Sequence, residues 1–378
     1  MARFVPGWRG DFGTWGTIRL ALRKSTVMER GGCATGGSRV PMKIQHSLLR
    51  LCAAITVAVG GVGCVTTPVA PDAGTAVAAI GPVYPGIGSY IVADANDGHV
   101  VLAHLADQRR PVASLTKVAT AIVVLDYLNS SRGDAGELMT VPPSVMMLEE
   151  RGPLSLVPGD QLTVRDGLYA AMMASDNAAA ETLALHFGQK LVAAGMGGGN
   201  SMAAFVSQMN GLAQRVGMRN TRFTNPHGLG QSGQGGYSSA ADVARLTVKG
   251  LRTPGLSFYS SQSERTLAVI RGGGPRPVLV RNTNELLGRA GVDGGKTGTT
   301  ASAGPCLMAT APRPATVTKR PDGSTVVVPN RLVVVVLGAN DRFNQAYTLL
   351  QQGWPAYERW RAAGSPAAAG TALGIAAP

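Results

Sequence analysis

The sequence predicts an α/β fold in which an antiparallel sheet flanked by helices carries an inserted helical subdomain. Three observations lead to this prediction. Two short apolar runs on either side of a turn at Asp94 to Gly98 predict an opening β-hairpin. Apolar residues then recur at helical spacing between Leu115 and Val216. Short runs rich in Val, Leu and Ile follow between Leu267 and Leu337, and an amphipathic helix is expected over 340–352.

The individual elements follow from local signals. Leu115, Val118, Ile122 and Leu125 share one helical face, which predicts a helix from about Ser114 to Tyr127. The other helices and the strands are expected where caps, apolar spacing or β-branched runs mark them. These are helices over 163–173, 178–187 and 202–216, one capped by Ser239 and Asp242, and strands at 267–270, 278–280, 306–309, 326–328 and 332–337.

The start of the chain resembles an export signal. Met42 opens a basic segment, Leu51 to Gly63 is almost entirely apolar, and this run is too short to span a bilayer. We therefore interpret residues 1–41 as a non-native or disordered extension, 42–64 as a signal peptide and 65–86 as a flexible linker. A catalytic domain is expected over 87–362 and a disordered tail over 363–378.

Cys64 ends the apolar run and resembles the lipidated cysteine of bacterial lipoproteins, although Gly61 replaces the usual Leu. The alternative is cleavage in the Ala-rich stretch, after Ala76 to Ala78. Either cut leaves at most Cys64 and Cys306, so no disulfide framework is implied. The chain is expected to be exported to the periplasm or cell envelope, with membrane contact only through an N-terminal lipid.

The net charge of +13 does not indicate nucleic-acid binding. Residues 1–64 hold +7 of it, which leaves +6 for residues 65–378, with few aromatics and no basic stripe. A moderate excess of this kind favours solubility or attraction to an anionic cell-wall polymer. No cofactor or metal is expected either, because the histidines are scattered and no His-Glu-x-x-His pattern occurs.

Three short motifs indicate acyl-transfer chemistry. Ser114 and Lys117 lie three residues apart on one helical turn, Ser175 to Asn177 follow 61 residues later, and Lys296 to Gly298 a further 121 residues on. A serine hydroxyl is a poor nucleophile and needs an adjacent base to take its proton. Lys117 can be that base only if burial and a neighbouring positive charge, expected from Lys296, lower its pKa.

The remaining motif residues suit the other steps of such a reaction. Ser175 is expected to relay a proton to the leaving amine, and the amide of Asn177 to hold Lys117 and the substrate backbone. A cation and a hydroxyl at Lys296 and Thr297 would bind a terminal carboxylate, beside Gly298, where a peptide can lie close to the strand. The backbone N–H groups of Ser114 and Thr299 are the expected oxyanion hole.

These motifs, with longer stretches around them, resemble the low-molecular-mass penicillin-binding proteins of the D-Ala-D-Ala carboxypeptidase family. The similar stretches are 113–121, 162–170, 225–229, 292–298 and 331–339, whereas the loop at 148–156 is less typical. The resemblance implies the serine β-lactamase/DD-peptidase fold. It also implies removal of the terminal D-Ala from peptidoglycan stem peptides through an acyl-enzyme at Ser114, and covalent inhibition by β-lactam antibiotics.

Three alternatives remain. A DD-endopeptidase that cuts peptidoglycan cross-links would use the same site. A class A β-lactamase would need a Glu-x-x-Leu-Asn loop, which is absent between Asn177 and Lys296. A catalytically silent peptidoglycan-binding module would not need the intact pair Ser114 and Lys117, and labelling by penicillin separates it from an enzyme. No Gly-x-Ser-x-Gly elbow suggests another serine hydrolase.

Overall fold

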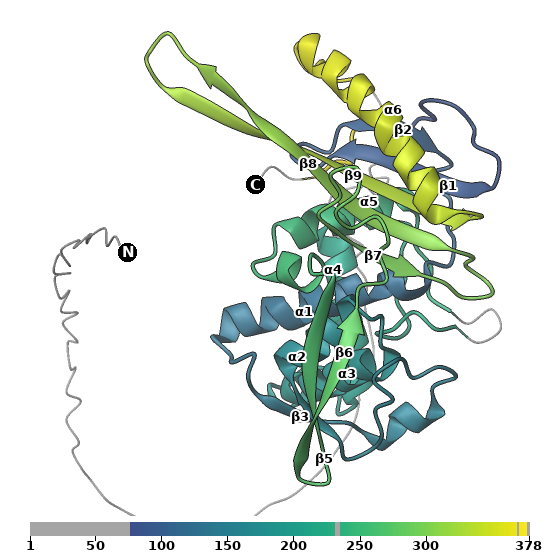
Figure 1. Ribbon diagram of the computed structural model, residues 1–378, viewed down its shortest axis with the longest axis vertical. Coiled ribbons are helices and arrows are strands. Elements are labelled where there is room, and N and C mark those ends of the chain that lie inside the picture. The colour runs from purple at the N-terminus through teal and green to yellow at the C-terminus, as the bar shows by residue number, and fades with distance from the viewer. Residues whose placement is uncertain (1–75, 231–234, 369, 376–378) are drawn as a thin grey trace, which may run out of the picture. The chain divides into compact units, whose positions relative to one another are not determined.

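The computed structural model describes residues 76–230, 235–368 and 370–375, and over these ranges it shows a mixed α/β domain (Figure 1). Five antiparallel strands form one sheet in the order β2-β1-β9-β8-β7, so that β7, which carries the third motif, is an edge strand. The predicted fold class is confirmed. The strands are β1 (Ile87–Asp94), β2 (Val100–His104), β7 (Gly294–Gly298), β8 (Cys306–Lys319) and β9 (Thr325–Ala339).

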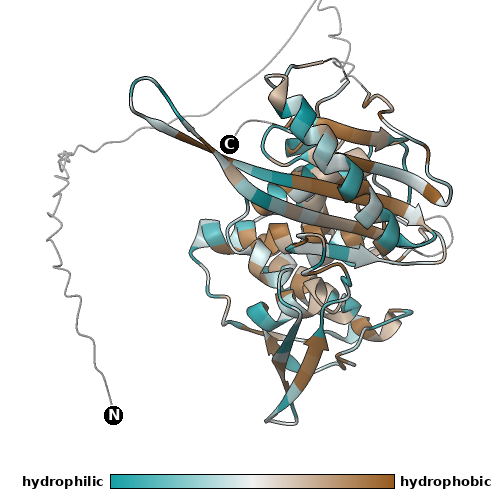
Figure 2. Cartoon of the chain, turned by 45° about the horizontal axis from the view of Figure 1, so that its top comes forward, coloured by the Kyte–Doolittle hydropathy of each residue, from teal (hydrophilic) through white to brown (hydrophobic). Residues whose placement is uncertain are grey.

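Helices cover both faces of this sheet, which explains the unbroken apolar run in β9. Successive side chains of a strand point to opposite faces. Val333 and Val335 belong to the core shared with α5 (Ala240–Leu251), whereas Leu332 and Val334 belong to the core shared with α6 (Arg342–Ala362). Both sets are buried, and the central strands are correspondingly apolar in Figure 2.

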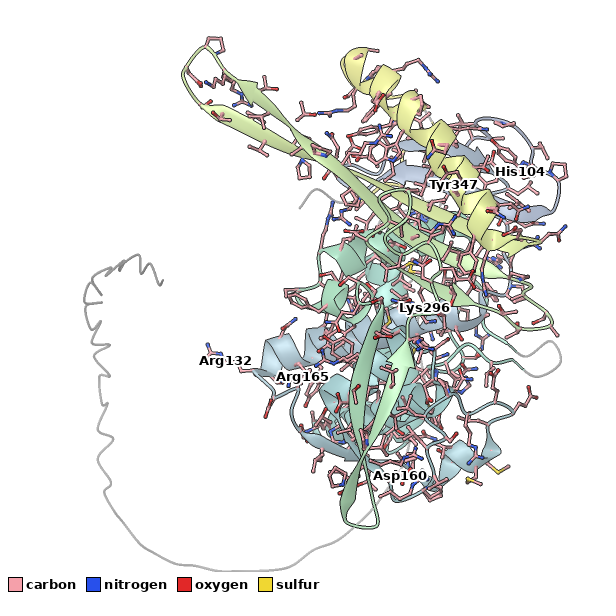
Figure 3. The ribbon with its side chains drawn as sticks, viewed as in Figure 1. His104, Arg132, Asp160, Arg165, Lys296 and Tyr347 are labelled. Atoms are coloured by element: carbon pink, nitrogen blue, oxygen red, sulfur yellow. The ribbon has the colours of Figure 1, made fainter. Side chains whose placement is uncertain are left out.

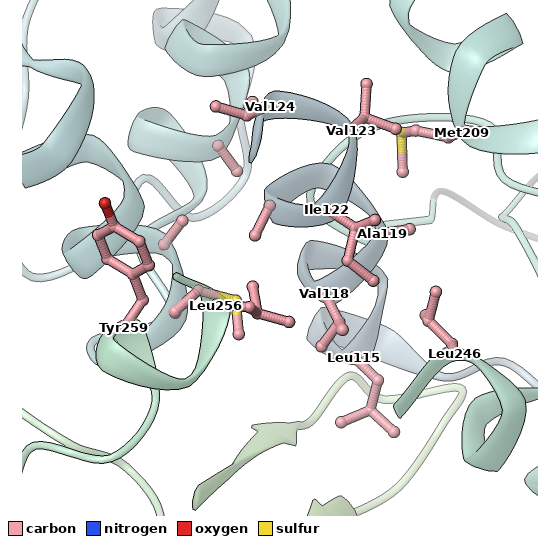
Figure 4. Close-up of a cluster of buried hydrophobic side chains, with 14 of the residues drawn as sticks. Leu115, Val118, Ala119, Ile122, Val123, Val124, Met209, Leu246, Leu256 and Tyr259 are labelled. Atoms are coloured by element: carbon pink, nitrogen blue, oxygen red, sulfur yellow. The ribbon is translucent and has the colours of Figure 1, made fainter. Parts of the chain in front are cut away.

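The helical subdomain is built around α1 (Thr116–Ser131), which directly follows the short 3-10 helix η1 (Ala113–Leu115). Val118, Ile122 and Val124 are at most 1% exposed, so α1 is buried on more than one side (Figure 4). Each such side chain contributes about 2 kcal/mol through burial. The helices packed around it are α2 (Val164–Met172), α3 (Asn177–Ala193) and α4 (Ser201–Arg215).

A second sheet has the strand order β3-β4-β5-β6, in which β5 and β6 contain the strands predicted at 267–270 and 278–280, whereas β3 and β4 were not predicted. Its two long strands form a hairpin whose turn residues Gly272 and Gly273 both have positive φ, as the tight turns of hairpins require. The other two strands have three residues each. Their bounds are β3 (Leu138–Thr140), β4 (Gln161–Thr163), β5 (Glu264–Arg271) and β6 (Gly274–Arg281).

Some element boundaries differ from those predicted. Ser114 lies in the 3-10 turn before α1 rather than on the α-helix itself. The two strands expected at 326–328 and 332–337 form one strand, β9, because both segments pair with β8. The closing helix α6 extends ten residues past the predicted end at 352 and passes through Pro355.

Both ends of the described domain pack beside β2. Ile80, within the predicted linker, pairs with Ala103. Residues 370–375, within the predicted disordered tail, also make defined contacts: Leu373 is 1% exposed, and its carbonyl accepts a hydrogen bond from Arg245. No helix among the described residues is long and apolar enough to cross a membrane.

Candidate active site

Ser114 and Lys117 meet at the junction of η1 and α1. Lys117 Nζ lies 2.7 Å from Ser114 Oγ, as the three-residue spacing predicted. The backbone of the preceding residue, Ala113, has a φ of +49°, which is uncommon for a residue other than glycine. Ser114 is 9% exposed, so its hydroxyl keeps limited access from outside while Lys117 is completely buried.

Three acceptors surround the Lys117 ammonium and use all three of its donors. Besides Ser114 they are Asn177 Oδ1 at 2.6 Å and the carbonyl oxygen of His227 at 2.9 Å. Asn177 Nδ2 donates in turn to the carbonyl oxygen of Glu150, which fixes the orientation of the amide. The lysine is therefore held in one position relative to the serine hydroxyl.

Burial lowers the pKa of Lys117 to about 7, whereas the negative charges of Asp176 and Glu150 act in the opposite direction. From the sequence, the positive charge of Lys296 was expected to contribute to this shift. In the structure burial is the main cause of the lowered pKa of Lys117, and the charge of Lys117 also lowers the pKa of Lys296. Near neutral pH a large fraction of Lys117 is therefore uncharged and able to accept a proton.

Lys296, on β7, joins the second and third motifs. Its side chain is labelled in Figure 3 and is 1% exposed. Its ammonium donates to Ser175 Oγ at 2.8 Å and to the carbonyl oxygen of Thr297 at 2.7 Å. Burial first, and then the charges of Lys117 and Arg342, hold the pKa of Lys296 well below its usual value. The two buried lysines thus oppose each other's protonation.

The second motif forms a strained turn between α2 and α3. Ser175 has a φ of +59°, which directs the chain so that its hydroxyl meets Lys296. Asp176 caps α3 by accepting from Ala179 N, and its other oxygen accepts from Leu154 N at 3.0 Å. This aspartate therefore ties the loop after Gly152 to the turn that carries Ser175.

Glycines bring the backbone of the site together. A Cβ at Gly298 would lie 2.9 Å from Ser114 N, so the edge strand passes directly over the serine. Gly228 has a φ of +84°, and a Cβ there would lie 1.9 Å from the carbonyl oxygen of Ala113. Thr297 Oγ1 lies 2.5 Å from Thr283 Oγ1, just past the end of β6.

Two residues that contact the site, Arg342 and His227, were not assigned a role from the sequence. Arg342 Nη1 donates to the carbonyl oxygen of Gly298 and to Thr299 Oγ1, both at 2.8 Å, yet a lone Arg at the start of a helix gives no signal. His227 acts through its backbone carbonyl. Burial, aided by the charge of Lys117, lowers the pKa of His227 to about 3, so its ring is neutral.

The structure thus brings Ser114, Lys117, Ser175, Asn177 and Lys296 together. Thr297 and Gly298 follow Lys296 on β7, and Thr299 comes directly after the strand. Cys64 lies outside the described residues. Within the described ranges, no group of three His, Cys, Asp or Glu side chains is arranged to hold a metal ion. The described cysteine, Cys306, is buried and unpaired.

Comparisons with known proteins identify the family of the chain. The sequence model of the D-alanyl-D-alanine carboxypeptidase family matches residues 85–319. A D-alanyl-D-alanine endopeptidase of Pseudomonas aeruginosa is 38% identical over 225 residues, which are 58% of this chain and 66% of that protein. The D-alanyl-D-alanine carboxypeptidase DacC of Escherichia coli is 31% identical over 280 residues, 71% and 62% of the two chains. The chain therefore spans just under two thirds of the length of these relatives.

Solved structures share the fold. A D-alanyl-D-alanine carboxypeptidase from Mycobacterium tuberculosis superposes with a TM-score of 0.58 at 27% identity, over 74% of this chain and 96% of that one. A mutant of a Streptomyces DD-transpeptidase superposes with a TM-score of 0.61 at 24% identity, over 73% and 100%. At that identity the second match supports the fold alone.

Proposed function

Because the chain belongs to the D-alanyl-D-alanine carboxypeptidase family, we propose that it is a serine peptidase that removes the terminal D-alanine from peptidoglycan stem peptides. The reaction runs through an acyl-enzyme at Ser114. One observation carries this proposal: a fully buried lysine with a pKa of about 7 donates a hydrogen bond to the Ser114 hydroxyl. A neutral amine at that position is the base that a serine nucleophile needs.

In the proposed first step, Lys117 takes the proton of Ser114 Oγ as this oxygen attacks the carbonyl carbon of the penultimate D-alanine. The negative charge that develops on the carbonyl oxygen is stabilised by the backbone N–H groups of Ser114 and Thr299. The close approach of Gly298 to Ser114 supports this arrangement. Asn177 and the carbonyl of His227 keep Lys117 in place throughout.

The terminal carboxylate of the substrate is proposed to lie beside Lys296 and Thr297, with Arg342 adding positive charge nearby. A bound carboxylate stabilises the charged form of Lys296 and so offsets the effects that lower its pKa. When the C–N bond breaks, the Ser175 hydroxyl gives its proton to the leaving nitrogen and recovers one from Lys296, to which it is hydrogen-bonded. The lysine pair ends this step with the proton on Lys117 instead of Lys296.

The proton on Lys117 then returns through solvent to Lys296, which leaves Lys117 neutral again. Water attacks the ester at Ser114, and Lys117 takes a proton from this water and gives it to Ser114 Oγ as the ester bond breaks. The second product is the shortened stem peptide. β-Lactam antibiotics are proposed to acylate the same serine. Labelled penicillin tests the assignment: peptide mapping should find the label on Ser114, and Ser114→Ala should abolish it, whereas Ser130→Ala at the exposed end of α1 should not. Label on another residue of the folded protein would overturn it.

A second candidate activity is cleavage of peptidoglycan cross-links. The observation that favours it is the 38% identity to an endopeptidase, together with 33% identity to the D-alanyl-D-alanine endopeptidase of Escherichia coli. Both activities break an amide bond between a D-alanine carbonyl and an amine that carries a carboxylate next to it. Digestion of purified muropeptides, with the products identified by mass, distinguishes the two.

The site of action is proposed to be the periplasm or cell envelope, where peptidoglycan lies. The apolar run from Leu51 to Gly63 supports export, and Cys64 supports anchoring through an N-terminal lipid. These segments lie outside the described residues. The anchor therefore rests on the sequence and is tested by membrane fractionation.

A further inference from the structure

A hollow of about 300 Å³ borders the half of the site that holds Ser175 and Lys296. Ala174, in its wall, directly precedes Ser175. Thr283, which also lines the hollow, has its hydroxyl 2.5 Å from that of Thr297. The hollow therefore begins where the proposed function places the terminal carboxylate and the leaving residue. Its lining residues are Pro153, Ala174, Leu279, Val280, Arg281 and Thr283.

The walls of the hollow are fixed to the same backbone that presents the second motif. Next to Pro153, Leu154 N donates to Asp176 Oδ2 at 3.0 Å. Thr283 N donates to the carbonyl oxygen of Met173 at 3.0 Å, two residues before Ser175. A ligand in the hollow is therefore held at a defined position relative to the site.

The chemistry of the lining is apolar with one cation. Pro153, Ala174, Leu279 and Val280 offer hydrocarbon surface, and no acidic residue lines the hollow. The side chain of Arg281, at the end of β6, is 77% exposed and stands at the rim. Its nearest carboxylate, Glu264, is 3.5 Å away and 56% exposed, so this pair leaves the arginine accessible to another anion.

We propose that this hollow is the subsite for a leaving group larger than D-alanine, with a hydrocarbon stem and an anionic end. The inference rests on the proposed function and identifies the cross-linked substrate as one the site accommodates. A D-alanine leaving group ends in a methyl, so it offers the hollow neither a hydrocarbon stem nor a further negative charge. In a cross-link the leaving amine carries the same adjacent carboxylate, and its hydrocarbon chain continues to a second stem peptide with free carboxylates.

The chemistry of bond cleavage is the same for both leaving groups. Ser114 Oγ bonds to the D-alanine carbonyl carbon, the C–N bond breaks, and the nitrogen takes its proton from Ser175. The hollow changes only the affinity for the part of the leaving group beyond the carboxylate. Its effect should therefore fall on KM for cross-linked substrates.

The test compares two substrates on each variant: a cross-linked muropeptide dimer and a monomeric pentapeptide. Arg281→Glu reverses the charge at the rim, and Leu279→Ser removes apolar wall. We expect Arg281→Glu to lower the ratio of cross-link cleavage to D-Ala release by about fivefold, through a higher KM for the cross-linked substrate. The decrease should be smaller at high salt, because the charge of Arg281 is exposed and therefore screened. Arg320→Glu, the same change at the distant turn between β8 and β9, should leave this ratio as in the wild type.

Two results would overturn the subsite: an unchanged ratio in both hollow variants, or no cleavage of cross-links by the wild-type protein while it releases D-Ala. Labelling by penicillin at the wild-type rate checks that each variant is folded. Failure of the proposed function is a different result, since the wild-type protein would then show neither D-Ala release nor label on Ser114.

Discussion

Lys117 Nζ and Ser114 Oγ lie 2.7 Å apart, and the lysine of this pair has no exposed surface. A lysine in water holds its proton until pH 10 or above, and in that state it cannot act as a base. Burial removes the solvation that stabilises the charge, and this lowers the pKa to about 7. The short contact and the lowered pKa both suit the proposed role of Lys117 as the base for Ser114 at neutral pH.

Replacing Lys117 by arginine should therefore abolish acylation, because a guanidinium keeps its proton and cannot take that of Ser114. Loss of a general base slows a reaction by about 10² to 10⁴. The measurement is the rate of labelling by penicillin, with the thermal midpoint recorded to show that the variant is folded. Lys249→Arg, on the partly exposed ion pair with Asp126, is the matched control. Labelling of Lys117→Arg at near-normal rate would show that another group is the base.

The acylation rate should rise with pH through about 7, as Lys117 loses its proton, and fall again at the higher pH at which Lys296 loses its own. The sign follows from the role of the base: below its pKa Lys117 is protonated, and each further pH unit lowers the reactive fraction about tenfold. The negative charge of Glu150 raises the pKa of Lys117, so Glu150→Gln should move the midpoint to lower pH, by about 0.3 units for an exposed charge. The neighbouring Glu149→Gln is the control. A flat profile between pH 6 and 8 would rule out Lys117 as the titrating group.

Gly228→Ala should destabilise the protein and slow acylation. The residue has a φ of +84°, and its new Cβ would lie 1.9 Å from the carbonyl oxygen of Ala113, next to Ser114. Gly159→Ala separates the cost of a positive φ from the cost of the steric clash. Gly159 has a φ of +87°, but a Cβ added there would meet nothing within 4 Å. We expect about 1 kcal/mol of destabilisation at Gly159 from the backbone alone and roughly 3 kcal/mol at Gly228. If urea unfolding showed the same loss of unfolding free energy for Gly228→Ala as for Gly159→Ala, the close contact at Gly228 would relax at no cost.

Sequence reasoning located the parts of the site that depend on local geometry. The contact between Ser114 and Lys117 follows from a three-residue spacing on one turn. The second and third motifs pointed to Ser175 to Asn177 and Lys296 to Gly298 as the residues around this pair. Sequence could not locate the carbonyl of His227, since every residue has one and only the fold directs it to Lys117. Arg342 is 46 residues beyond Lys296 in the chain, and only the antiparallel sheet brings the two close enough for their charges to interact.

In the fold, too, the elements with a clear local pattern were predicted and the others were not. The apolar run in β9 was predicted as a strand, and the helices on either side explain why it is not interrupted by polar residues. Of the second sheet, β5 and β6 were predicted, but β3 and β4 were missed because they have only three residues each, and β4 pairs with β5, which is distant in sequence. So short a strand has no periodicity to detect. The φ of +59° at Ser175 could not be predicted from the sequence either. A serine is uncommon in the left-handed region of backbone conformation, and the surrounding structure holds it there.

Cys64→Ala should release the protein from membranes if lipidation follows export. The expectation rests on the short apolar run, the cysteine at its end and the linker after it. The measurement is the share of the protein in the membrane fraction of cells that produce the full chain. Cys52→Ala, a cysteine within the apolar run, is the matched control and should fractionate as the wild type. Unchanged fractionation of Cys64→Ala would contradict the anchor.

The protein should release D-Ala from a pentapeptide quickly and hydrolyse bound penicillin slowly. Both reactions begin with attack by Ser114, so the difference must arise at deacylation. After peptide cleavage the D-Ala departs and water can reach the ester, whereas the opened penicillin keeps its leaving group attached and blocks that approach.

A class A β-lactamase overcomes this block with a dedicated glutamate that activates the water. Between Asn177 and Lys296 the glutamates are Glu181, Glu264 and Glu285, and none is followed by the Leu-Asn pattern. Glu181 is 8% exposed, accepts a hydrogen bond from Ser144 with one carboxylate oxygen, and has the other 3.8 Å from the ring of His227, so both oxygens already face protein partners. Lys117 must then be the base for both acylation and deacylation. Its hydrogen bonds to Ser114, Asn177 and His227 hold it in one position, which is poorly suited to activating water beside a shielded ester. Measuring D-Ala release and penicillin hydrolysis on one preparation decides the matter, because hydrolysis of penicillin at a rate that rivals peptide cleavage would identify a β-lactamase instead.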